Sequence, residues 1–553
     1  MAAEDDAGER LPRDARGDRQ LGGEALRGGE AARDRARADD ERGGEAAVGA
    51  EQPDAEAPGG RSGLGRRQRG RGTWAAQDSA TAAASIRFAG FVAAMDTAHG
   101  QRDTRAVSAP PPPLAATADR RRRWLLLLFA VVAVLGGWYF GARAKGEDRE
   151  LPVYVAGGER MAAGAEIYRR QAGPDFEADK KPFTYPPFAA VPFVPYALLP
   201  ADWQAPLWFV VNFAVVLGLV RWLHRHARRA DPGLGPPRLV AFWLLVGVVG
   251  GRHVASVFTN QSHDLIVAGL LGLCAAAWMR QRAIAGAFAG LAAAFKATPL
   301  LLLGLFGLRL RVLAVALLLA AAALATLAPD WLCPRGDGKA WAVAWYELTL
   351  RGLDAGAAKA EGAWSSHNIL NQGLGGTLTR LFQPLDATST FTVGEPGTAL
   401  VAVLPPTVFR VVLHGGQLAV LALLALAARR GARAVAVAAD PAAMQRTVGL
   451  GEVGAFACGM LLLSPMSSKS HFCVWLLPVA FLAERLLRGR RCVAALALFV
   501  LAAVVALLAK DLLGKRLGNL VLAYGNATWA TLLLLLASVA ALGAEAKPAG
   551  GAR

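Results

Sequence analysis

The chain has 553 residues, of which 54% are hydrophobic, and it carries a formal net charge of +17. Its apolar residues are concentrated in blocks of about 15 to 22, the length that crosses a hydrocarbon core of about 30 Å. This pattern excludes an ordinary soluble domain. The basic residues lie mainly in short loops between the blocks, as the positive-inside bias predicts, so the charge does not indicate a nucleic-acid partner. The five cysteines show no paired spacing, which argues against a disulfide framework or a zinc site.

Three parts are expected along the chain. Residues 1–119 are rich in Ala, Gly, Arg, Asp and Glu and cannot bury enough apolar surface to fold, so they are predicted to be a disordered cytoplasmic tail. Residues 120–545 form the transmembrane domain. Residues 546–553 form a short C-terminal tail.

The charges around the first apolar block set the expected topology. Arg120–Arg123 precede the block Trp124–Gly141 directly, which predicts a cytoplasmic N-terminus and places the loop 142–185 outside. The later blocks give about twelve crossings with both termini in the cytoplasm. A second long outer loop is predicted over residues 328–405. The fold class is therefore an all-α, multi-pass bundle in the cell membrane.

Three stretches carry more local predictions. The proline-broken run Pro186–Pro200 is expected to be interfacial or re-entrant. The apolar blocks Ala283–Phe295 and Leu300–Leu308 are short for full spans and could form a broken pair. Gly286 and Gly290 stand four residues apart and predict a face for close helix packing.

Mixed functional groups gather in the predicted outer turns, whereas the cytoplasmic loops carry mostly arginine. Ionisable residues near membrane depth are costly and usually line a site or a cavity. An enzyme that works at the outer face on a lipid-borne substrate would have this asymmetry. The polar outer loop Glu150–Tyr185 is the first of these regions.

Five motifs follow in order through the outer turns. They are Glu150-Leu-Pro-Val-Tyr154 with Phe183-Thr-Tyr185-Pro-Pro-Phe188, Asn260-Gln261-Ser262, Lys296-Ala-Thr-Pro299, Asn368 to Gln372, and Leu463-Ser-Pro-Met-Ser467 with His471. This series resembles glycosyltransferase family 87, membrane mannosyltransferases of the GT-C fold that use polyprenyl-phosphate sugars. The resemblance covers roughly Arg120 to Leu487.

The resemblance implies a GT-C-like bundle and a specific reaction. A hexose, expected to be mannose, would pass with inversion from a polyprenyl-phosphate donor to a lipid or glycan acceptor on the extracytoplasmic face. Such a transfer needs one carboxylate to take the acceptor proton, and the phosphate leaves without a general acid. The resembling enzymes place an Asp where this chain has Glu150, so Glu150 is the expected base. Asp148 is the fallback, and both carboxylates could instead be solvated loop residues.

Cationic side chains are expected to stabilise the departing phosphate. Lys296 is the leading candidate because it ends an apolar run, where an ammonium without an anionic partner is costly; the alternative is a lysine that snorkels to the interface. The weaker candidates are Arg252, His263, Lys469 and His471. The residues expected to contact substrate are Tyr154, Tyr185, Asn260, Gln261, Asp264, Asn371 and Gln372.

Two alternatives remain open from the sequence. The broken helices at Pro186–Pro200 and Lys296–Pro299 would suit the mid-membrane site of a secondary transporter. A catalytically inactive relative that binds lipid-linked sugars is the other, because Glu150 departs from the family, as do Ser468 and Ser470, which replace its usual aromatic residue and first histidine. No metal-ligand cluster has recognisable spacing, and no cofactor is expected, although scattered outer carboxylates could hold one divalent cation.

Overall fold

The computed structural model describes residues 127, 130–132, 134–139, 149–168, 183–230, 235–351, 365–385, 399–489 and 492–546. The predicted tail 1–119, the basic run Arg120–Arg123 and the fallback base Asp148 lie outside the described residues. Within the first apolar block, the described residues from 127 to 139 are helical. Gly136 of that helix lies directly against the Phe209 ring.

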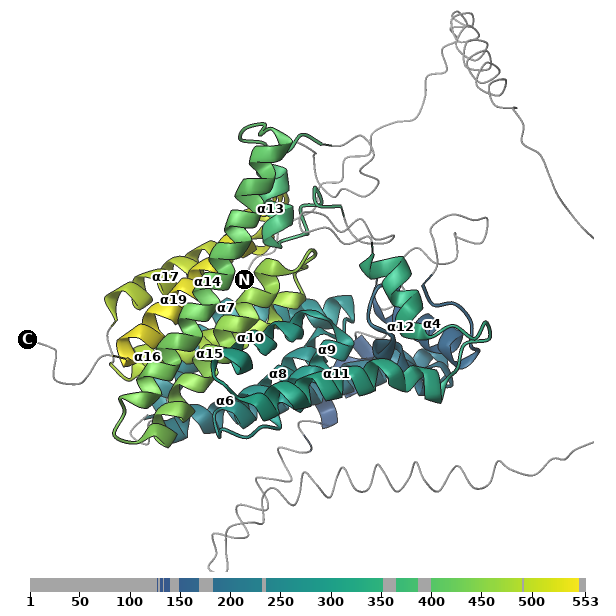
Figure 1. Cartoon of the computed structure of the whole chain (residues 1–553), viewed down its shortest axis with the longest axis horizontal. Helices are drawn as coiled ribbons and strands as arrows, with labels where there is room; N and C mark the ends of the chain where they lie inside the picture. Colours follow the sequence, from purple (N-terminus) through teal and green to yellow (C-terminus); the bar gives the residue numbers. More distant parts are fainter. Residues whose placement is uncertain are drawn as a thin grey trace, which may run out of the picture. The chain divides into compact units, whose positions relative to one another are not determined.

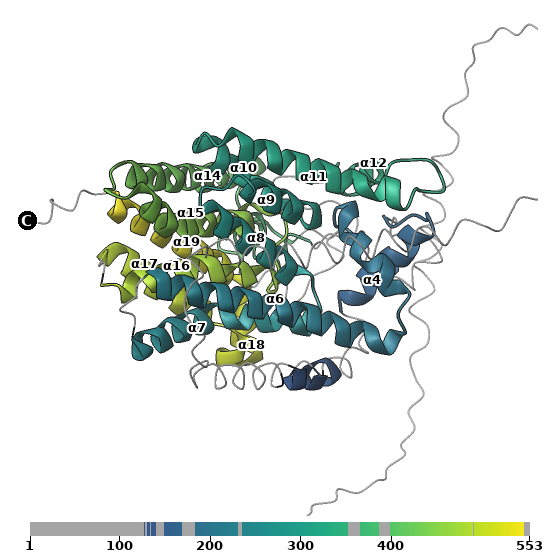
Figure 2. The same ribbon diagram turned by 90° about the horizontal axis from the view of Figure 1, so that it is seen from below.

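The described part of the chain is built from helices (Figures 1 and 2). In the first half these are α4 (Leu151–Ala162), the 3-10 helix η2 (Pro187–Phe193), α5 (Val194–Ala197), α6 (Ala201–Ala230), α7 (Pro236–Asn260), α8 (Asp264–Trp278), α9 (Ala285–Phe295), the 3-10 helix η3 (Thr298–Leu301), α10 (Leu302–Leu308) and α11 (Val312–Leu332). In the second half they are α12 (Trp341–Trp345), a π-helical turn (Tyr346–Leu350), α13 (Leu374–Phe382), α14 (Pro406–Ala436), α15 (Pro441–Leu463), the 3-10 helix η5 (His471–Trp475), α16 (Leu476–Leu487), α17 (Val493–Leu507), α18 (Lys510–Ala523) and α19 (Asn526–Glu545).

Six of these helices are long and apolar enough to cross a membrane: α6, α7, α11, α14, α15 and α19. A seventh candidate is α17 with α18, which are bent by 82° at the break between them. Helices α8, α9 and α10 are apolar but shorter. The multi-pass, all-helical class is confirmed for the described residues, whereas the count of about twelve crossings stays a prediction.

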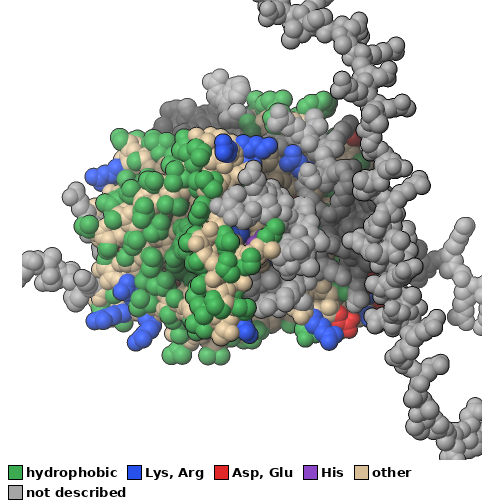
Figure 3. All heavy atoms as spheres, turned by 90° about the horizontal axis from the view of Figure 1, so that it is seen from above, with side chains coloured by type: hydrophobic (Ala, Val, Ile, Leu, Met, Phe, Trp, Pro, Cys, Tyr) green, Lys and Arg blue, Asp and Glu red, His purple; other side chains and the backbone are tan. Residues whose placement is uncertain are grey.

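Helix α15 lies at the centre of the bundle. Most of its side chains are buried, and it packs against α14, α16, α19 and α8. Hydrophobic side chains cover much of the molecular face seen in Figure 3, and most Lys and Arg side chains lie toward its margins. A surface of this kind suits contact with lipid acyl chains.

Helices α9 and α11 approach each other through the two predicted glycines. A Cβ atom at Gly286 would lie 1.9 Å from the Ala314 carbonyl oxygen, and one at Gly290 would lie 2.3 Å from that of Leu318. Both distances are far below van der Waals contact, so only glycine fits. The prediction of a close-packing face is confirmed, and it fixes α9, whose last residue precedes Lys296.

The predicted outer loop Glu150–Tyr185 is wrong in one respect, because it begins with helix α4. The buried residues of α4 recur at helical spacing: Leu151, Tyr154, Val155, Gly158 and Met161. Pro152 stands in the first turn, where an N–H group would have no partner within the helix, so its missing N–H costs nothing. The helix packs against η2 and α5, the short proline-broken pieces expected over Pro186–Pro200. The predicted outer loop 328–405 likewise contains α12 and α13.

A second buried polar group, here named the Glu452 cluster, joins α15 to α8 and to the end of α10. Arg309 donates to the Glu452 carboxylate and, over 2.7 Å, to the Gln445 Oε1. Trp278 donates its indole N–H to the other Glu452 oxygen over 2.7 Å, and the Gln445 amide bonds the Trp278 carbonyl over 3.3 Å. Each charged or amide group in this cluster has a partner.

Candidate active site

The turn between α7 and α8 supplies the first part of the site. Helix α7 ends where Gln261 adopts a left-handed conformation, with φ of 55°. This reverses the chain so that Ser262, His263 and Asp264 follow in a compact, buried turn. The indole N–H of Trp208 donates to the Gln261 carbonyl over 2.9 Å and holds the turn in place.

Glu150 is anchored on that same turn. Its backbone N–H donates to the Asn260 carbonyl over 3.0 Å, and the side chain of Arg149 donates to the Thr259 carbonyl over 2.6 Å. Helix α4 then begins at Leu151 and carries Tyr154 back over the Glu150 carboxylate one turn later. The start of the predicted loop is therefore fixed by main-chain contacts to α7.

Two tyrosine hydroxyls donate to one oxygen of the Glu150 carboxylate. Tyr154 makes the shorter bond, and Tyr185 donates to the same Oε2 over 3.2 Å. Burial raises the pKa of both tyrosines well above the usual value, with the neighbouring Glu150 charge as the next cause. Both hydroxyls therefore stay protonated and act as donors.

Burial also raises the pKa of Glu150 from 4.5 to about 7, and the nearby Asp264 carboxylate acts in the same direction. The Tyr154 and Tyr185 hydroxyls and the Lys296 ammonium oppose this shift. A carboxyl group with a pKa near neutral can exchange a proton with a substrate at physiological pH. Glu150 thus has the acid-base property expected of a general base.

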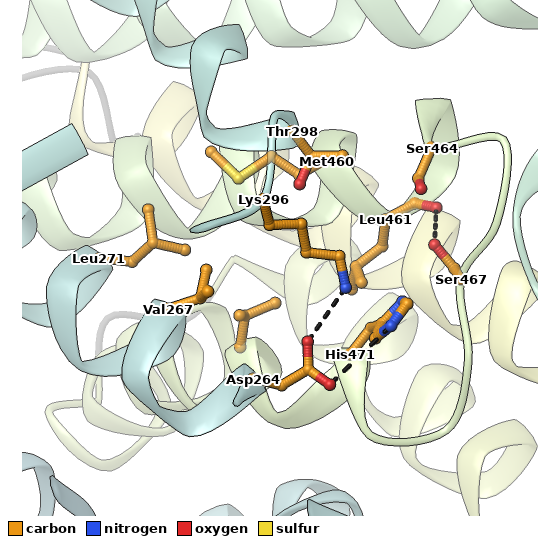
Figure 4. A pocket seen from close by; sticks show the side chains of 11 residues that line it. Asp264, Val267, Leu271, Lys296, Thr298, Met460, Leu461, Ser464, Ser467 and His471 are labelled. Atoms are coloured by element: carbon orange, nitrogen blue, oxygen red, sulfur yellow. Dashed lines mark hydrogen bonds and ion pairs between the residues drawn. The ribbon is translucent and has the colours of Figure 1, made fainter. Parts of the chain in front are cut away.

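Asp264, the first residue of α8, binds the predicted phosphate-binding lysine. Lys296 Nζ donates to Asp264 Oδ1 over 3.0 Å (Figure 4). The Ser262 hydroxyl donates to Asp264 Oδ2 over 2.8 Å. His471 Nε2 lies 3.8 Å from the same Oδ2. A lysine ammonium has three donors, so the contact with Asp264 leaves others for a substrate anion.

His471 enters this group as a neutral ring. The backbone N–H of Ser468 donates to its Nδ1 over 3.0 Å, so the neutral ring carries its proton on Nε2, which faces Asp264. Burial lowers the pKa of His471 to about 3; Asp264 raises it, and Lys296 lowers it. The ring therefore offers a donor without adding charge.

His263 precedes Asp264 in the turn, and its ring packs against the two tyrosines that bind Glu150. Its ring packs edge-on against Tyr185, with centroids 4.5 Å apart, and against Tyr154 at 5.0 Å. Neither buried ring nitrogen makes a hydrogen bond of good geometry among the described residues. Burial lowers the pKa of His263 to about 4, although the Asp264 charge and the Phe295 backbone favour the charged form.

A small pocket of about 20 Å³, open to solvent, adjoins the Asp264–Lys296 pair. Its polar wall contains Asp264, Lys296, Thr298, Ser464, Ser467 and His471 (Figure 4). Its apolar wall contains Val267, Leu271, Met460, Leu461 and Val474. A cavity with charge on one side and hydrocarbon on the other suits a phosphate joined to an apolar chain. Glu150 does not itself line this cavity.

Arg252 and Lys469 lie near each other, and neither lines the Lys296 cavity. Arg252 donates to the Ala506 carbonyl over 2.8 Å, and Lys469 pairs with Asp511 over 3.7 Å. The two are linked through His253, whose Nδ1 bonds the Lys469 carbonyl over 2.9 Å. The structure therefore separates these two predicted phosphate ligands from the Lys296 cavity.

Asn371 and Gln372 join loops rather than point into the cavity. Asn371 Nδ2 donates to the Pro465 carbonyl over 3.0 Å, and its Oδ1 accepts from the Ser467 backbone over 3.2 Å. Gln372 donates its amide to the carbonyls of Ile369 and Leu522, each over 2.7 Å. These bonds occupy both side chains and shape the Ser464–His471 turn. Asn260, in contrast, contributes through its backbone carbonyl to Glu150.

The structure adds Ser262 to the predicted residues, together with the cavity residues Thr298, Ser464 and Ser467. The sequence signal for them was their position within the turn motifs, next to Asp264, Lys296 and His471. Within the described residues there is no group of three or more His, Cys, Asp or Glu side chains arranged to hold a metal ion.

Comparisons with known proteins place these motifs in a family context. The model of glycosyltransferase family 87 matches residues 183–467. A polyprenol-phosphate-mannose-dependent alpha-(1-2)-phosphatidylinositol pentamannoside mannosyltransferase of Mycolicibacterium smegmatis is 34% identical over 187 residues, which cover 33% of this chain and 43% of that protein.

Two further relatives carry similar names. A polyprenol-phosphate-mannose-dependent alpha-(1-2)-phosphatidylinositol mannoside mannosyltransferase of Mycolicibacterium smegmatis is 28% identical over 365 residues, which cover 62% of this chain and 71% of that protein. A pentamannoside mannosyltransferase of Mycobacterium tuberculosis is 43% identical over 75 residues, which cover 13% of this chain and 17% of that protein. The matched region is thus less than half of the first relative. No solved structure matches this chain.

Proposed function

The chain belongs to glycosyltransferase family 87, and on that premise we propose that it is a membrane mannosyltransferase with Glu150 as its general base. The donor is a mannose carried on a polyprenyl phosphate, as in the printed names of the relatives. The acceptor is a hydroxyl of a lipid or glycan, and those names favour a mannosylated phosphatidylinositol. The site faces outward, and both termini lie in the cytoplasm.

One observation carries the proposal. The Glu150 carboxylate lies near the Asp264–Lys296 pair, and both charged groups of that pair are close enough to shift the pKa of Glu150. A base for the acceptor and a cation for the leaving group are therefore neighbours. Glu150, Asp264 and Lys296 come from three separate parts of the chain, and the fold brings them together.

The proposed transfer is a single displacement. The acceptor hydroxyl oxygen forms a bond to the anomeric carbon of mannose while the bond from that carbon to the phosphate oxygen breaks. The hydroxyl proton moves to the Glu150 carboxylate, and the phosphate leaves with the bonding electron pair. Attack from the face opposite the phosphate inverts the anomeric carbon.

Lys296 stabilises the negative charge that develops on the departing phosphate. Asp264 holds the ammonium in place before the donor binds, and the free N–H groups of the ammonium then bind phosphate oxygens. The apolar wall formed by Val267, Leu271 and Met460 receives the first part of the prenyl chain. The Nε2–H of His471 donates a hydrogen bond to the departing phosphate and does not transfer its proton.

The test is transfer of radiolabelled mannose from a polyprenyl-phosphate donor to the lipids of membranes that contain the full chain. Glu150→Gln should abolish transfer and leave the amount of folded protein unchanged. Glu159→Gln is the matched control, because Glu159 is an exposed carboxylate of the same helix. Wild-type turnover in Glu150→Gln would remove the proposed base.

A binding protein without activity is a second candidate, favoured by the glutamate at position 150. It predicts that the donor binds to the wild-type chain while no label reaches any membrane lipid. Movement of label across sealed vesicles without transfer would instead indicate the transporter alternative. Accessibility of cysteines introduced next to the outer turns, measured in intact cells, tests the proposed orientation.

A further inference from the structure

Helix α18 has an exposed face that the proposed reaction does not use. It follows the apolar helix α17 after an 82° bend, so α18 runs nearly at right angles to α17. Leu512 is 68% exposed and Leu517 53% exposed, and Leu520 and Tyr524 are exposed as well. Exposed apolar side chains on a helix at right angles to a span are typical of helices that lie in the membrane interface.

The backbone of α18 is shaped for this position. Gly514 adopts a φ of 74° and divides the helix into two pieces. A Cβ atom at Gly518 would lie 2.4 Å from the Lys510 Cα, so the second piece packs closely on the first. Gly518 and Ala523 turn inward, whereas Arg516, Leu517 and Leu520 remain outside. The helix therefore presents an apolar strip with basic residues beside it.

The charge at this place runs against the pattern in the rest of the chain. Exposed Lys510, Lys515 and Arg516 are joined by Arg252 and Lys469, and Asp511 is the nearby carboxylate among the described residues. Helix α18 also adjoins the site end of the bundle, because Gln372 bonds both the Leu522 carbonyl and the Ser467 carbonyl. Positive charge at the outer end is not explained by the positive-inside bias.

We propose that α18 lies in the headgroup layer of the leaflet into which the site opens, and that Lys515 and Arg516 bind the phosphates of anionic phospholipids there. The exposed leucines enter the acyl-chain boundary, and the basic side chains reach the phosphodiester groups above it. Charge complementarity selects this partner: an apolar strip alone would accept any lipid, whereas basic residues beside it favour an anionic headgroup. This inference depends on the chain being a membrane protein and not on mannosyl transfer.

Hydrogen exchange of the α18 amides, measured with the full chain in nanodiscs, tests the proposal. In pure phosphatidylcholine α18 should be partly protected, and replacement of a third of that lipid by phosphatidylglycerol should slow its exchange several-fold. Lys515→Gln with Arg516→Gln should remove the phosphatidylglycerol-dependent part, since each basic residue near an anionic surface contributes about a fivefold gain in affinity. The exchange of α15, buried at the centre, reports on folding in the same sample.

Two further variants separate a charge effect from other causes. Arg228→Gln with Arg229→Gln removes two exposed basic residues from the last turn of α6 and should leave the response of α18 unchanged. Lys515→Arg with Arg516→Lys keeps both charges and should retain the response. Equal exchange in the two lipid mixtures would overturn the proposal. Protection by polyprenyl phosphate but not by phosphatidylglycerol would also overturn it, and would assign α18 to donor binding instead.

Discussion

Two of the buried polar clusters in the described part of the chain differ in how completely their groups are paired. In the Glu452 cluster, both carboxylate oxygens, the Arg309 guanidinium and the Gln445 amide are all hydrogen-bonded. In the cluster around Glu150 and Asp264, the described residues offer the His263 nitrogens no hydrogen bond of good geometry, and the Lys296 ammonium bonds one of them, Asp264. A fully paired cluster rigidifies a fold, whereas the unused donors and acceptors of an incompletely paired cluster can bind a ligand.

This difference predicts distinct effects of substitution at the two places. Changes in the Glu452 cluster should reduce stability and leave the reaction of each folded molecule intact. Changes around Glu150 should do the reverse. The four substitutions below are arranged from the largest expected effect to the smallest.

Glu150→Gln should lower kcat by about a thousandfold or more, because a positioned general base contributes about 10² to 10⁴ in rate and the amide cannot accept the proton. The amide can still accept a hydrogen bond from Tyr154, so folding should be retained. Mannosyl transfer at saturating donor is the measurement. A loss of only a few fold would mean that another group takes the proton.

Glu452→Ala should destabilise the fold by about 3 to 5 kcal/mol, since it leaves the Arg309 charge buried without its carboxylate. Denaturation in mixed micelles measures the loss, and kcat is measured on the folded fraction. Glu452→Gln keeps the shape and should cost less. If Glu452→Ala retained wild-type stability but lost turnover, the contrast between the two clusters would be wrong.

Lys296→Met should reduce kcat/KM for the donor by about 10- to 100-fold, which corresponds to about 1.5 to 3 kcal/mol for a charge-assisted hydrogen bond. Lys296→Arg should recover part of the loss because it restores the charge. The dependence of rate on donor concentration separates the two. An unchanged kcat/KM in Lys296→Met would move the phosphate away from this lysine.

Tyr185→Phe should change the pH dependence more than the maximal rate. The base must be ionised, so wild-type transfer should fall as the pH is lowered through about 7, the pKa of Glu150. Loss of the Tyr185 hydroxyl removes a hydrogen bond to the Glu150 carboxylate and so favours the neutral carboxyl group. The pH at which the rate falls to half should therefore rise by about one unit. Tyr346→Phe, at an exposed tyrosine, is the control. If the pH dependence of Tyr185→Phe equals that of the wild type, the Tyr185 hydrogen bond does not lower the pKa of Glu150.

Local parts of this architecture could be predicted from the sequence because they depend on neighbouring residues. Gly286 and Gly290 announce close packing through their spacing, and the prolines of Pro186–Pro200 exclude a regular span. Helix α4 could also have been predicted: its buried residues recur at positions 151, 154, 155, 158 and 161. The surrounding polar residues of the loop hid that period.

Contacts between distant elements could not be predicted in the same way. Lys296 and Asp264 are paired because α8 and α9 place the end of one helix beside the start of the other, and no local pattern encodes that distance. The roles of Asn371 and Gln372 were equally hidden, since their partners are backbone carbonyls, which every residue offers. Arg252 and Lys469 have the right charge for phosphate but do not line the Lys296 cavity.

The backbone bond from Glu150 to the Asn260 carbonyl has a consequence for anyone who redesigns this protein. It fixes the point from which the carboxylate reaches Tyr154 and Tyr185. Aspartate, the residue of the enzymes that this chain resembles, would start from the same point and fall short by about one C–C bond, ~1.5 Å. The length of the side chain at position 150 and the backbone bond that anchors it must therefore be changed together.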